Sequence, residues 1–405
     1  MHRPWRYLAI FAATFVACAG LSAAFTVAVD PYYVFDTPRL AGWNLAKPAA
    51  ANVSAVAKTY LMERTRPRTL LLGNSRIEAG LDPDSARWPD AMRPVFNAGL
   101  PGRGLDIAAK LLEDALAVPG LRHVVVGLDV LDFLQVDAGP APPPGPVDAG
   151  ADQDRMRVRP DLTDNPRHRL ARVEDMLAAT LTLGAVTDSV ATILAQRDTS
   201  PATMTPLGFN PLGDYLPYVK AHGFRGLFEQ KQAQYAEHFR SYPHPNFADP
   251  YRTGGFRALR EIIGTARAHD IDVTLVIYPY HAWVMDLLRQ NGLWGVFETW
   301  KRALVSVVGA LDPGGHVRIV DFSGYNLYTT TPVPPQGDTV TDVPWYWEPG
   351  HFRGALGDRV IARLYDGEAT GFGRDLTAAT VDDAIAAIRR EAERGRVPVG
   401  SAGTD

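Results

Sequence analysis

The sequence predicts a three-layer α/β/α domain with about five parallel strands, preceded by one N-terminal transmembrane helix. The first observation is that short apolar runs alternate with runs of helical spacing over most of the chain. This alternation is typical of a parallel sheet covered by helices on both faces. The second observation is that the chain begins with one long apolar run without charged residues. Together they predict a globular domain attached to a membrane-spanning helix.

The apolar run Tyr7–Val29 is long enough to cross a hydrocarbon core of roughly 30 Å. Arg3 and Arg6 precede it, and the first acidic residue, Asp30, follows it. Because basic flanks favour the cytoplasmic side, residues 1–6 are expected in the cytoplasm and all later residues outside it. We therefore predict a single-pass inner-membrane protein whose globular domain lies in the periplasm or otherwise outside the cytoplasm.

Two other interpretations of the N-terminus are open. A signal peptide cleaved near Ser22–Ala24 would release the domain from the membrane. A lipoprotein signal at Cys18 is a weaker alternative, because the residues before it lack the usual leucine. The apolar run is longer than a typical signal-peptide core, which favours a transmembrane anchor retained over residues 7–29.

The region after the anchor divides into a connector over residues 30–66, expected to be polar with one short helix, and a βα domain over residues 67–370. Five compact apolar runs are predicted strands: Arg68–Leu72, Pro94–Asn97, His123–Gly127, Val273–Tyr278 and Val317–Phe322. Five runs with helical spacing are predicted helices: Leu105–Leu116, Phe256–His269, Trp283–Leu293, Phe297–Leu311 and Gly354–Leu364. This order predicts a doubly wound sheet of the flavodoxin-like kind.

An insertion over residues 135–250 separates the third and fourth predicted strands. It begins with a loop rich in Pro, Gly and Ala at Ala138–Ala151, and we expect helix next and irregular structure later. At this place in the fold the insertion would lie near the carboxyl ends of the strands and cap a site there. Residues 371–405 are expected to form a surface helix at Ala378–Arg394 and a disordered tail.

The composition excludes several classes of function. The net charge is −4 and no basic stripe occurs, so nucleic acid is not an expected partner. Cys18 is the single cysteine, which excludes an intramolecular disulfide and a cysteine-based metal site. The histidines lack the mutual spacing of a zinc site. We therefore expect neither a metal nor a cofactor.

Candidate functional residues gather in the segments that follow the predicted strands, where ligands bind in an open α/β sheet. These segments are Gly73–Arg76, Ala98–Arg103, Leu128–Asp132, Pro279–His281, Ser323–Tyr325 and Trp345–His351. They contain a serine, glycines, histidines and carboxylates. Such residues are the parts of a nucleophile, an oxyanion hole and a charge-relay pair.

Three of these segments resemble blocks of the SGNH (GDSL-like) hydrolase superfamily. Leu70–Arg76 resembles the first block, a Gly-x-Ser turn after the first strand, and Asn97–Gly102 resembles the second, whose glycine donates a backbone N–H to the oxyanion. Glu348–His351 resembles the last, in which an acid stands three residues before the catalytic histidine. The resemblance covers roughly residues 68 to 366 without the insertion. It points to the membrane-anchored, DltD-like or AlgJ/AlgX-like branch, linked to O-acylation of envelope polysaccharides or teichoic acids.

The resemblance implies a role for each matching residue. Ser75 would be the nucleophile, His351 the general base and then acid, and Glu348 the group that orients the imidazole. The N–H groups of Ser75 and Gly99 would stabilise the oxyanion, with Asn74 as a substitute donor. Further residues are candidates for contact with the substrate: Arg76, Asn97, Asp129, Tyr280, His281 and Trp347.

Two positions depart from the superfamily pattern. The triad acid is Glu348 where aspartate is usual, a change that other triads tolerate. The third block is normally Gly-x-Asn-Asp, but here Asp129 stands where the amide donor is expected. An ionised Asp129 would oppose a developing oxyanion, and loss of one donor typically costs roughly 10²–10³ in rate. Arg76 would either offset this charge or bind an anionic group of the substrate.

Purely structural interpretations are also open. A serine after a strand is often an ordinary helix cap, Gly99 can simply serve a tight turn, and Glu348 and His351 can be surface residues of a Pro-Gly turn. His281, at a strand end, is a rival for the histidine role. The carboxylates Asp129 and Asp132 can cap a helix, and the rings of Trp345 and Trp347 can pack in the core or stack on sugars.

Two functions therefore remain open. One is a serine-dependent esterase or O-acyltransferase that acts on acylated envelope polysaccharide through an acyl-enzyme on Ser75. The other is a catalytically inactive scaffold or glycan-binding subunit of a polysaccharide modification or export system, which the carboxylate at Asp129 favours. Either protein would be compatible with an integral-membrane acyltransferase as a partner.

Overall fold

The computed structural model describes residues 4–135, 153–159, 161–198, 203–367 and 371–394. Its centre is a six-stranded sheet in the order β2-β1-β3-β4-β5-β8. The strands are β1 (Thr69–Leu72), β2 (Val95–Asn97), β3 (His123–Leu128), β4 (Asp272–Ile277), β5 (Val317–Asp321) and β8 (Arg374–Asp375). The first five are parallel and β8 pairs antiparallel with β5. The parallel part has the 2-1-3-4-5 order of flavodoxin-like sheets, so the predicted mostly parallel α/β sheet is confirmed.

Helices cover the sheet, and every residue of β1 is buried. The helix α4 packs against α9, which also contacts α11, while α3 packs against α12. Their bounds are α3 (Ser75–Gly80), α4 (Leu105–Leu116), α9 (Gly254–Ala268), α10 (Ala282–Gln290), α11 (Trp294–Leu311) and α12 (Gly354–Tyr365). Each of the five predicted strands begins and ends within one residue of the observed strand. Hydrophobic runs this short and this regular fix strand positions locally.

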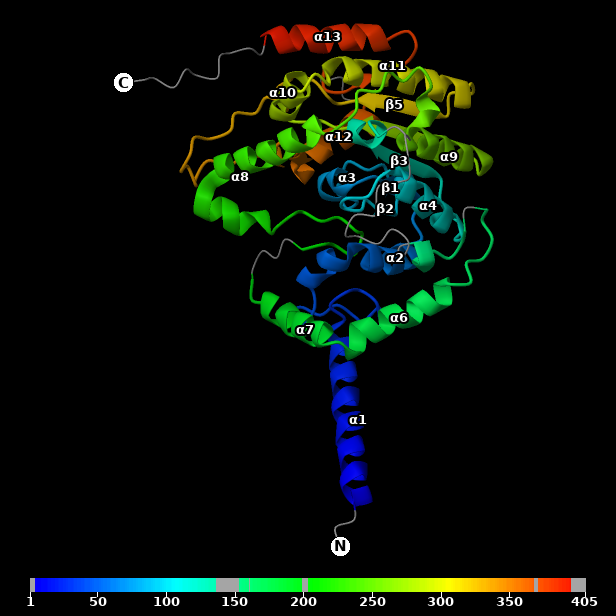
Figure 1. Cartoon of the computed structure of the whole chain (residues 1–405), viewed down its shortest axis with the longest axis vertical. Coiled ribbons are helices and arrows are strands. Elements are labelled where there is room, and N and C mark those ends of the chain that lie inside the picture. The colour runs from blue at the N-terminus through cyan, green and yellow to red at the C-terminus, as the bar shows by residue number, and fades with distance from the viewer. Residues whose placement is uncertain (1–3, 136–152, 160, 199–202, 368–370, 395–405) are drawn as a thin grey trace.

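The apolar helix α1 (Pro4–Val29) projects from the domain (Figure 1) and is long and apolar enough to span a membrane. The turn after it is built into the protein. Asp30 ends the helix with a left-handed backbone (φ 49°), its Oδ1 accepts the N–H of Val34 at 2.8 Å, and its Oδ2 lies 3.1 Å from Lys47 Nζ. Asn44 Nδ2 donates to the carbonyl of Val29. Polar partners thus satisfy the last carbonyls of the helix.

The connector is more than a polar spacer. It forms a 3₁₀ turn at Pro48–Val53 and the helix α2 (Ser54–Thr65), which is the short helix expected there. Ala57, Leu61 and Met62 belong to the main hydrophobic core. Residues 30–66 are therefore an integral part of the domain.

The described part of the insertion includes the helices α6 (His168–Leu181), α7 (Leu183–Ala195) and α8 (Tyr215–Arg240). The expectation of irregular structure in its later part holds for residues 203–214 and 241–248 but was wrong for Tyr215–Arg240, where α8 is helical with one break at Gly223 (φ 74°). The helix α8 packs on β6 (Tyr346–Glu348) and α10, so tertiary contacts supply the stability that its weakly periodic sequence does not indicate. The predicted loop at Ala138–Ala151 lies outside the described residues.

The C-terminal segment completes the sheet. Its strand β8 extends the edge next to β5, and α13 (Val381–Arg394) follows the expected surface helix closely. Ile385 and Ile388 of α13 are buried against the body of the domain, and α13 contacts α11. The predicted disordered tail, from residue 395, lies outside the described residues.

Candidate active site

Ser75 is the first residue of α3, directly after β1. The N-cap of this helix is Asn74, whose Oδ1 accepts the N–H of Arg76 at 3.0 Å. The interpretation of Ser75 as a helix cap was therefore wrong, because the neighbouring asparagine caps the helix. The hydroxyl of Ser75 is left available for another partner, and its side chain is partly exposed.

His351 and Glu348 face each other across an antiparallel pair, β6 and β7 (His351–Phe352). His351 Nε2 lies 2.7 Å from Ser75 Oγ, and its Nδ1 forms a hydrogen bond with Glu348 Oε1. Glu348 Oε2 accepts the N–H of Gly350 at 2.9 Å. Glu348 is fully buried, whereas 15% of the His351 side chain is exposed. A serine, a histidine and a buried carboxylate in this chain of hydrogen bonds have the geometry of a catalytic triad.

The buried carboxylate stays ionised. Burial alone would raise the pKa of Glu348, but His351, the Gly350 N–H and Arg76 outweigh it and hold that pKa below its usual value. Because the carboxylate takes the hydrogen of Nδ1, we assign the Nε2 of the neutral ring as the acceptor of the Ser75 hydroxyl hydrogen. The orientation needed for His351 to act as a base is thus present at rest.

Two glycines allow the nucleophile helix and the histidine segment to meet. A Cβ on Gly357, in α12, would lie 1.7 Å from the carbonyl oxygen of Gly80, the last residue of α3. A Cβ on Gly80 would lie 2.0 Å from the ring of Phe352, directly after His351. No side chain fits at either position, so α3 packs directly on α12 and β7.

The three predicted oxyanion donors differ in their surroundings. The N–H of Gly99 donates to Asn97 Oδ1 at 3.0 Å, and Asn74 Nδ2 donates to Asp129 Oδ2 at 3.2 Å. The N–H of Ser75, in contrast, has no acceptor among the residues that the structure describes. In this arrangement the N–H of Ser75 is a free donor beside its own hydroxyl, and Asn74 Nδ2 keeps a second hydrogen besides the one given to Asp129. Gly99 would have to leave Asn97 to become a donor to the oxyanion.

Asp129 is part of a buried charged cluster. Its carboxylate pairs with Arg76 and accepts hydrogen bonds from Tyr280 Oη at 2.8 Å and from the N–H of Leu131 at 3.1 Å. Arg76 Nε also donates to the carbonyl of Gly350 at 2.9 Å, beside His351. The charge that seemed to oppose catalysis is therefore balanced by Arg76, and the pair connects α3 to the histidine segment.

The candidate substrate-binding residues are mostly buried, and their polar groups form hydrogen bonds within the fold. Asn97 is fully buried, and its Nδ2 donates to the carbonyls of Ile77 and Leu81, both at 2.8 Å. Arg76, Asp129 and Tyr280 saturate one another as described, and each is 6% exposed or less. These groups hold the site together, because a buried polar group with its partners satisfied has no capacity left for a ligand.

Trp347 lies at the edge of the site. It is 5% exposed, Arg353 lies over its ring at 4.4 Å, and it borders a surface hollow together with Phe209 and Pro211 of the insertion. Trp347 is thus a predicted substrate-binding residue that borders an open hollow.

His281, the rival histidine, does not approach Ser75. It is the N-cap of α10: Nδ1 accepts the N–H of Trp283 at 3.3 Å, and Nε2 lies 3.0 Å from the carbonyl of Thr331. Burial lowers the pKa of His281 to about 4, although the Thr331 carbonyl and Glu348 act in the opposite direction. His281 is thus a neutral structural residue.

This pKa predicts an acid-sensitive fold. The unfolded chain binds a proton at His281 below its ordinary pKa of 6.5, whereas the folded protein does so only near 4. Stability is therefore lost as the pH falls from 7 to 4, by about 3 kcal/mol from this residue. In urea unfolding, the pH slope should be shallower for His281→Gln than for the parent. The exposed His269→Gln is the control, and an unchanged slope for His281→Gln would contradict the prediction.

Sequence reasoning missed Tyr235 and Lys58. Tyr235, from α8 of the insertion, has its Oη 3.5 Å from Arg76 Nη2, and a Cβ on Gly350 would meet this hydroxyl at 2.0 Å. The insertion thus reaches the site, as expected from its place in the fold. The sequence carried no signal for Tyr235, because its helix lies far from the site in the chain.

Lys58, from α2 of the connector, lies 2.9 Å from Glu78 Oε1 and donates to the carbonyl of Gly99. Both charged side chains are almost fully buried. We expect Lys58→Met to lower the free energy of unfolding by about 3–5 kcal/mol, because it leaves Glu78 without a buried counter-charge. Denaturant unfolding should show partial recovery in Lys58→Met/Glu78→Gln and no change in the exposed Lys220→Met. Equal stability of Lys58→Met and the parent would refute the predicted loss of unfolding free energy.

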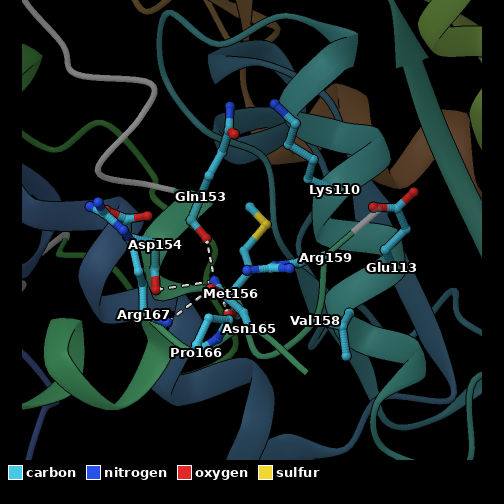
Figure 2. A pocket seen from close by; sticks show the side chains of 10 residues that line it. All are labelled: Lys110, Glu113, Gln153, Asp154, Met156, Val158, Arg159, Asn165, Pro166 and Arg167. Carbon is cyan, nitrogen blue, oxygen red and sulfur yellow. Dashed lines mark hydrogen bonds and ion pairs between the residues drawn. The ribbon is translucent and has the colours of Figure 1, made fainter. Parts of the chain in front are cut away.

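A second hollow lies away from Ser75. Figure 2 shows a cavity of about 270 Å³ between α4, which contributes Lys110 and Glu113, and the start of the insertion. Asn165 Nδ2 closes its insertion side by donating to the carbonyls of Gln153 at 3.0 Å and Met156 at 2.8 Å. Within the described part of the chain, its lining contains no serine, threonine, cysteine or histidine, so it offers no nucleophile or imidazole base comparable to those at Ser75.

No protein-family model and no curated protein sequence matches this chain. Among the described residues, no three His, Cys, Asp or Glu side chains lie close enough together to hold a metal ion. The functional interpretation therefore rests on the geometry around Ser75.

Proposed function

We propose that this protein is a membrane-anchored serine esterase or O-acyltransferase that resembles the SGNH superfamily and forms an acyl-enzyme on Ser75. The observation that carries the proposal is the hydrogen-bonded series from Ser75 Oγ through His351 to the buried Glu348. Ser75 and His351 are 276 residues apart in the chain. A hydroxyl, an imidazole and a carboxylate brought together from such distant segments, with the hydroxyl partly exposed, are what nucleophilic acyl transfer requires.

In the acylation step, Ser75 Oγ attacks the ester carbonyl while its proton moves to His351 Nε2. Glu348 stabilises the imidazolium that forms, and the Ser75 N–H donates to the developing oxyanion. His351 then gives the proton to the leaving alkoxide, so the alcohol departs and the acyl group stays on Ser75. In the second step, His351 removes a proton from water or from an acceptor hydroxyl, whose oxygen attacks the acyl-enzyme carbonyl. The bond between the acyl group and Ser75 Oγ then breaks, the carboxylic acid or the new ester leaves, and His351 returns the proton to Ser75 Oγ.

The substrate class follows from the place of the site. If α1 spans the inner membrane with the basic residues Arg3 and Arg6 inside, Ser75 lies on the periplasmic side. Acyl esters on envelope polysaccharides are substrates available there. The hollow beside Trp347 is rimmed by Asp82, Arg353 and Asp358, and an indole edge among polar side chains suits a sugar ring.

The test uses the full-length chain in detergent micelles. A fluorophosphonate probe should label it, and an activated acetyl ester should be hydrolysed with transient acetylation of Ser75, detected by peptide mass. Addition of an acetylated or unmodified polysaccharide then separates transfer from hydrolysis. Absence of both labelling and turnover would reject the esterase proposal.

A second candidate is a non-catalytic scaffold or glycan-binding subunit that partners an integral-membrane acyltransferase. The observation that favours it is the engagement of two predicted oxyanion donors, Gly99 and Asn74, by Asn97 and Asp129. For this candidate, glycan binding measured by calorimetry should be unaffected by Ser75→Ala, with no ester turned over by the parent protein.

A further inference from the structure

The helices α6 and α7 form a V whose vertex lies beside the domain end of α1 (Figure 1). They are bent by 64° relative to each other. Both contact α1, and Thr26 Oγ1 of α1 lies 3.3 Å from the carbonyl of Thr180, just before the vertex. Thr182 caps the start of α7 by accepting the N–H of Ala185 at 3.1 Å. The vertex is therefore an ordered feature held against the anchor.

The distribution of side chains on α6 and α7 is the reverse of that on an ordinary surface helix. Their buried positions are small or polar: Ala171, Asp175 and Ala179 in α6, and Ala185, Ser189 and Thr192 in α7. Their large apolar side chains are instead exposed, including Leu170, Val173, Leu177, Leu181, Leu183 and Leu194. A helix on a water-exposed surface would bury its large apolar residues and expose its polar ones.

The exposed large apolar side chains are concentrated on α1, α6 and α7. Among the described residues, 21 large hydrophobic side chains are exposed, of which 8 lie on α1, and 8 of the other 13 lie on α6 and α7. At the vertex, Leu181 is 57% exposed and Leu183 is 79% exposed. A contiguous apolar surface of this kind marks contact with a membrane or a partner.

The charges around the V distinguish its vertex from its arms. No charged residue occurs from Met176 to Thr187. Basic residues stand at the far ends of both arms, with Arg167 and Arg169 at the start of α6 and Arg197 after α7. Carboxylates also occur on the arms, with Asp154 paired to Arg167 and Asp198 directly after Arg197. An apolar centre with charged residues of both signs kept to its arms suits the boundary between acyl chains and headgroups.

The position of the vertex along α1 also agrees with the thickness of a bilayer. Tyr7 and Thr26 are 19 residues apart, which is roughly 28 Å along a helix at about 1.5 Å per residue. A hydrocarbon core is roughly 30 Å thick. If Tyr7 lies at the inner boundary, Thr26 and its neighbour Thr180 lie at the outer boundary.

We propose that the vertex of α6 and α7 inserts its exposed leucines into the outer leaflet of the bilayer beside α1. The occupant is lipid, because the uncharged vertex lies against α1, the helix that is long and apolar enough to span a membrane. The inference depends on α1 spanning the membrane and is independent of any chemistry at Ser75. Attachment through α1 and the V together fixes the orientation of the sheet relative to the membrane.

The test places a fluorescent label in the full-length chain, reconstituted in vesicles of phosphatidylethanolamine and phosphatidylglycerol. In a Cys18→Ser background, Leu181→Cys and Leu183→Cys are labelled with an environment-sensitive dye and exposed to lipids with spin labels on the acyl chain. Leu327→Cys and Val340→Cys, in the equally exposed segment between β5 and β6, are the controls. Cys18 of the parent, exposed on α1, reports insertion of the anchor.

Labels at the two vertex positions should shift to shorter wavelength and lose most of their fluorescence to the spin-labelled lipids, whereas the controls should lose little. Quenching at Cys18 without quenching at Leu181→Cys and Leu183→Cys would overturn the proposal while leaving the anchor intact. Absence of quenching at Cys18 as well would overturn both. Unchanged unfolding temperatures of the labelled variants establish that the substitutions leave the fold intact.

Discussion

Ser75→Ala is expected to abolish labelling by the fluorophosphonate probe and to lower kcat/KM for an activated ester by at least about 10³-fold. The reason is that the variant removes the hydroxyl oxygen that lies 2.7 Å from His351 Nε2 and would attack the ester carbonyl. Stability should change little, because Ser75 is partly exposed and Asn74 caps α3 in its place. Gel fluorescence and a steady-state ester assay make the measurement.

Ser306→Ala is the matched control for this variant. Ser306 is exposed on α11, so its replacement should leave both labelling and turnover as in the parent. If Ser75→Ala keeps the turnover of the parent, the triad geometry has no catalytic role and the scaffold proposal gains support. If both variants lose turnover, the assay reports damage to the fold and not the loss of a nucleophile.

Asp129→Asn is expected to destabilise the protein by about 3–5 kcal/mol, because it leaves the Arg76 guanidinium buried without a counter-charge. Arg76 is 6% exposed and Asp129 2% exposed, so water cannot compensate. Thermal unfolding in detergent should show a lower transition temperature, with part of the loss recovered in Arg76→Met/Asp129→Asn. Ester turnover should fall as well, because Arg76 also holds the carbonyl of Gly350 beside His351.

Higher turnover in Asp129→Asn would contradict this prediction. If Asp129 simply occupied the place of a missing amide donor, Asp129→Asn would raise turnover and leave stability unchanged. Asp132→Asn is the control within the same turn. Burial, reinforced by Asp129 and Asp106 against Arg76, raises the pKa of Asp132 well above its usual value, so the charged form of this carboxyl is disfavoured in the fold. Its amide replacement should therefore cost little.

The sequence by itself determined the local elements. The positions of five strands follow from short apolar runs, and α4 was predicted over the observed Leu105–Leu116. The apolar helix ahead of Asp30 follows from length and composition alone. These features depend on side chains close together in the chain, where periodicity of 2 or 3.6 residues is enough to predict structure.

Only the tertiary structure decided which residues of the site meet. The motifs predicted that Ser75 and His351 are partners, but their contact depends on the close packing at Gly80 and Gly357. The sequence left open whether Arg76 offsets the charge of Asp129 or binds the substrate. The structure decides for the first, since the two side chains become adjacent when β1 and β3 lie side by side.

The same distinction holds for the membrane-facing surface. The apolar residues of α6 and α7 have helical spacing in the sequence, which by itself predicts a buried face. The fold instead turns that face outward beside α1 and buries Ala171, Ser189 and similar residues. Periodicity fixes which residues share a face of a helix, but only packing against the rest of the chain decides whether that face meets the core, water or lipid.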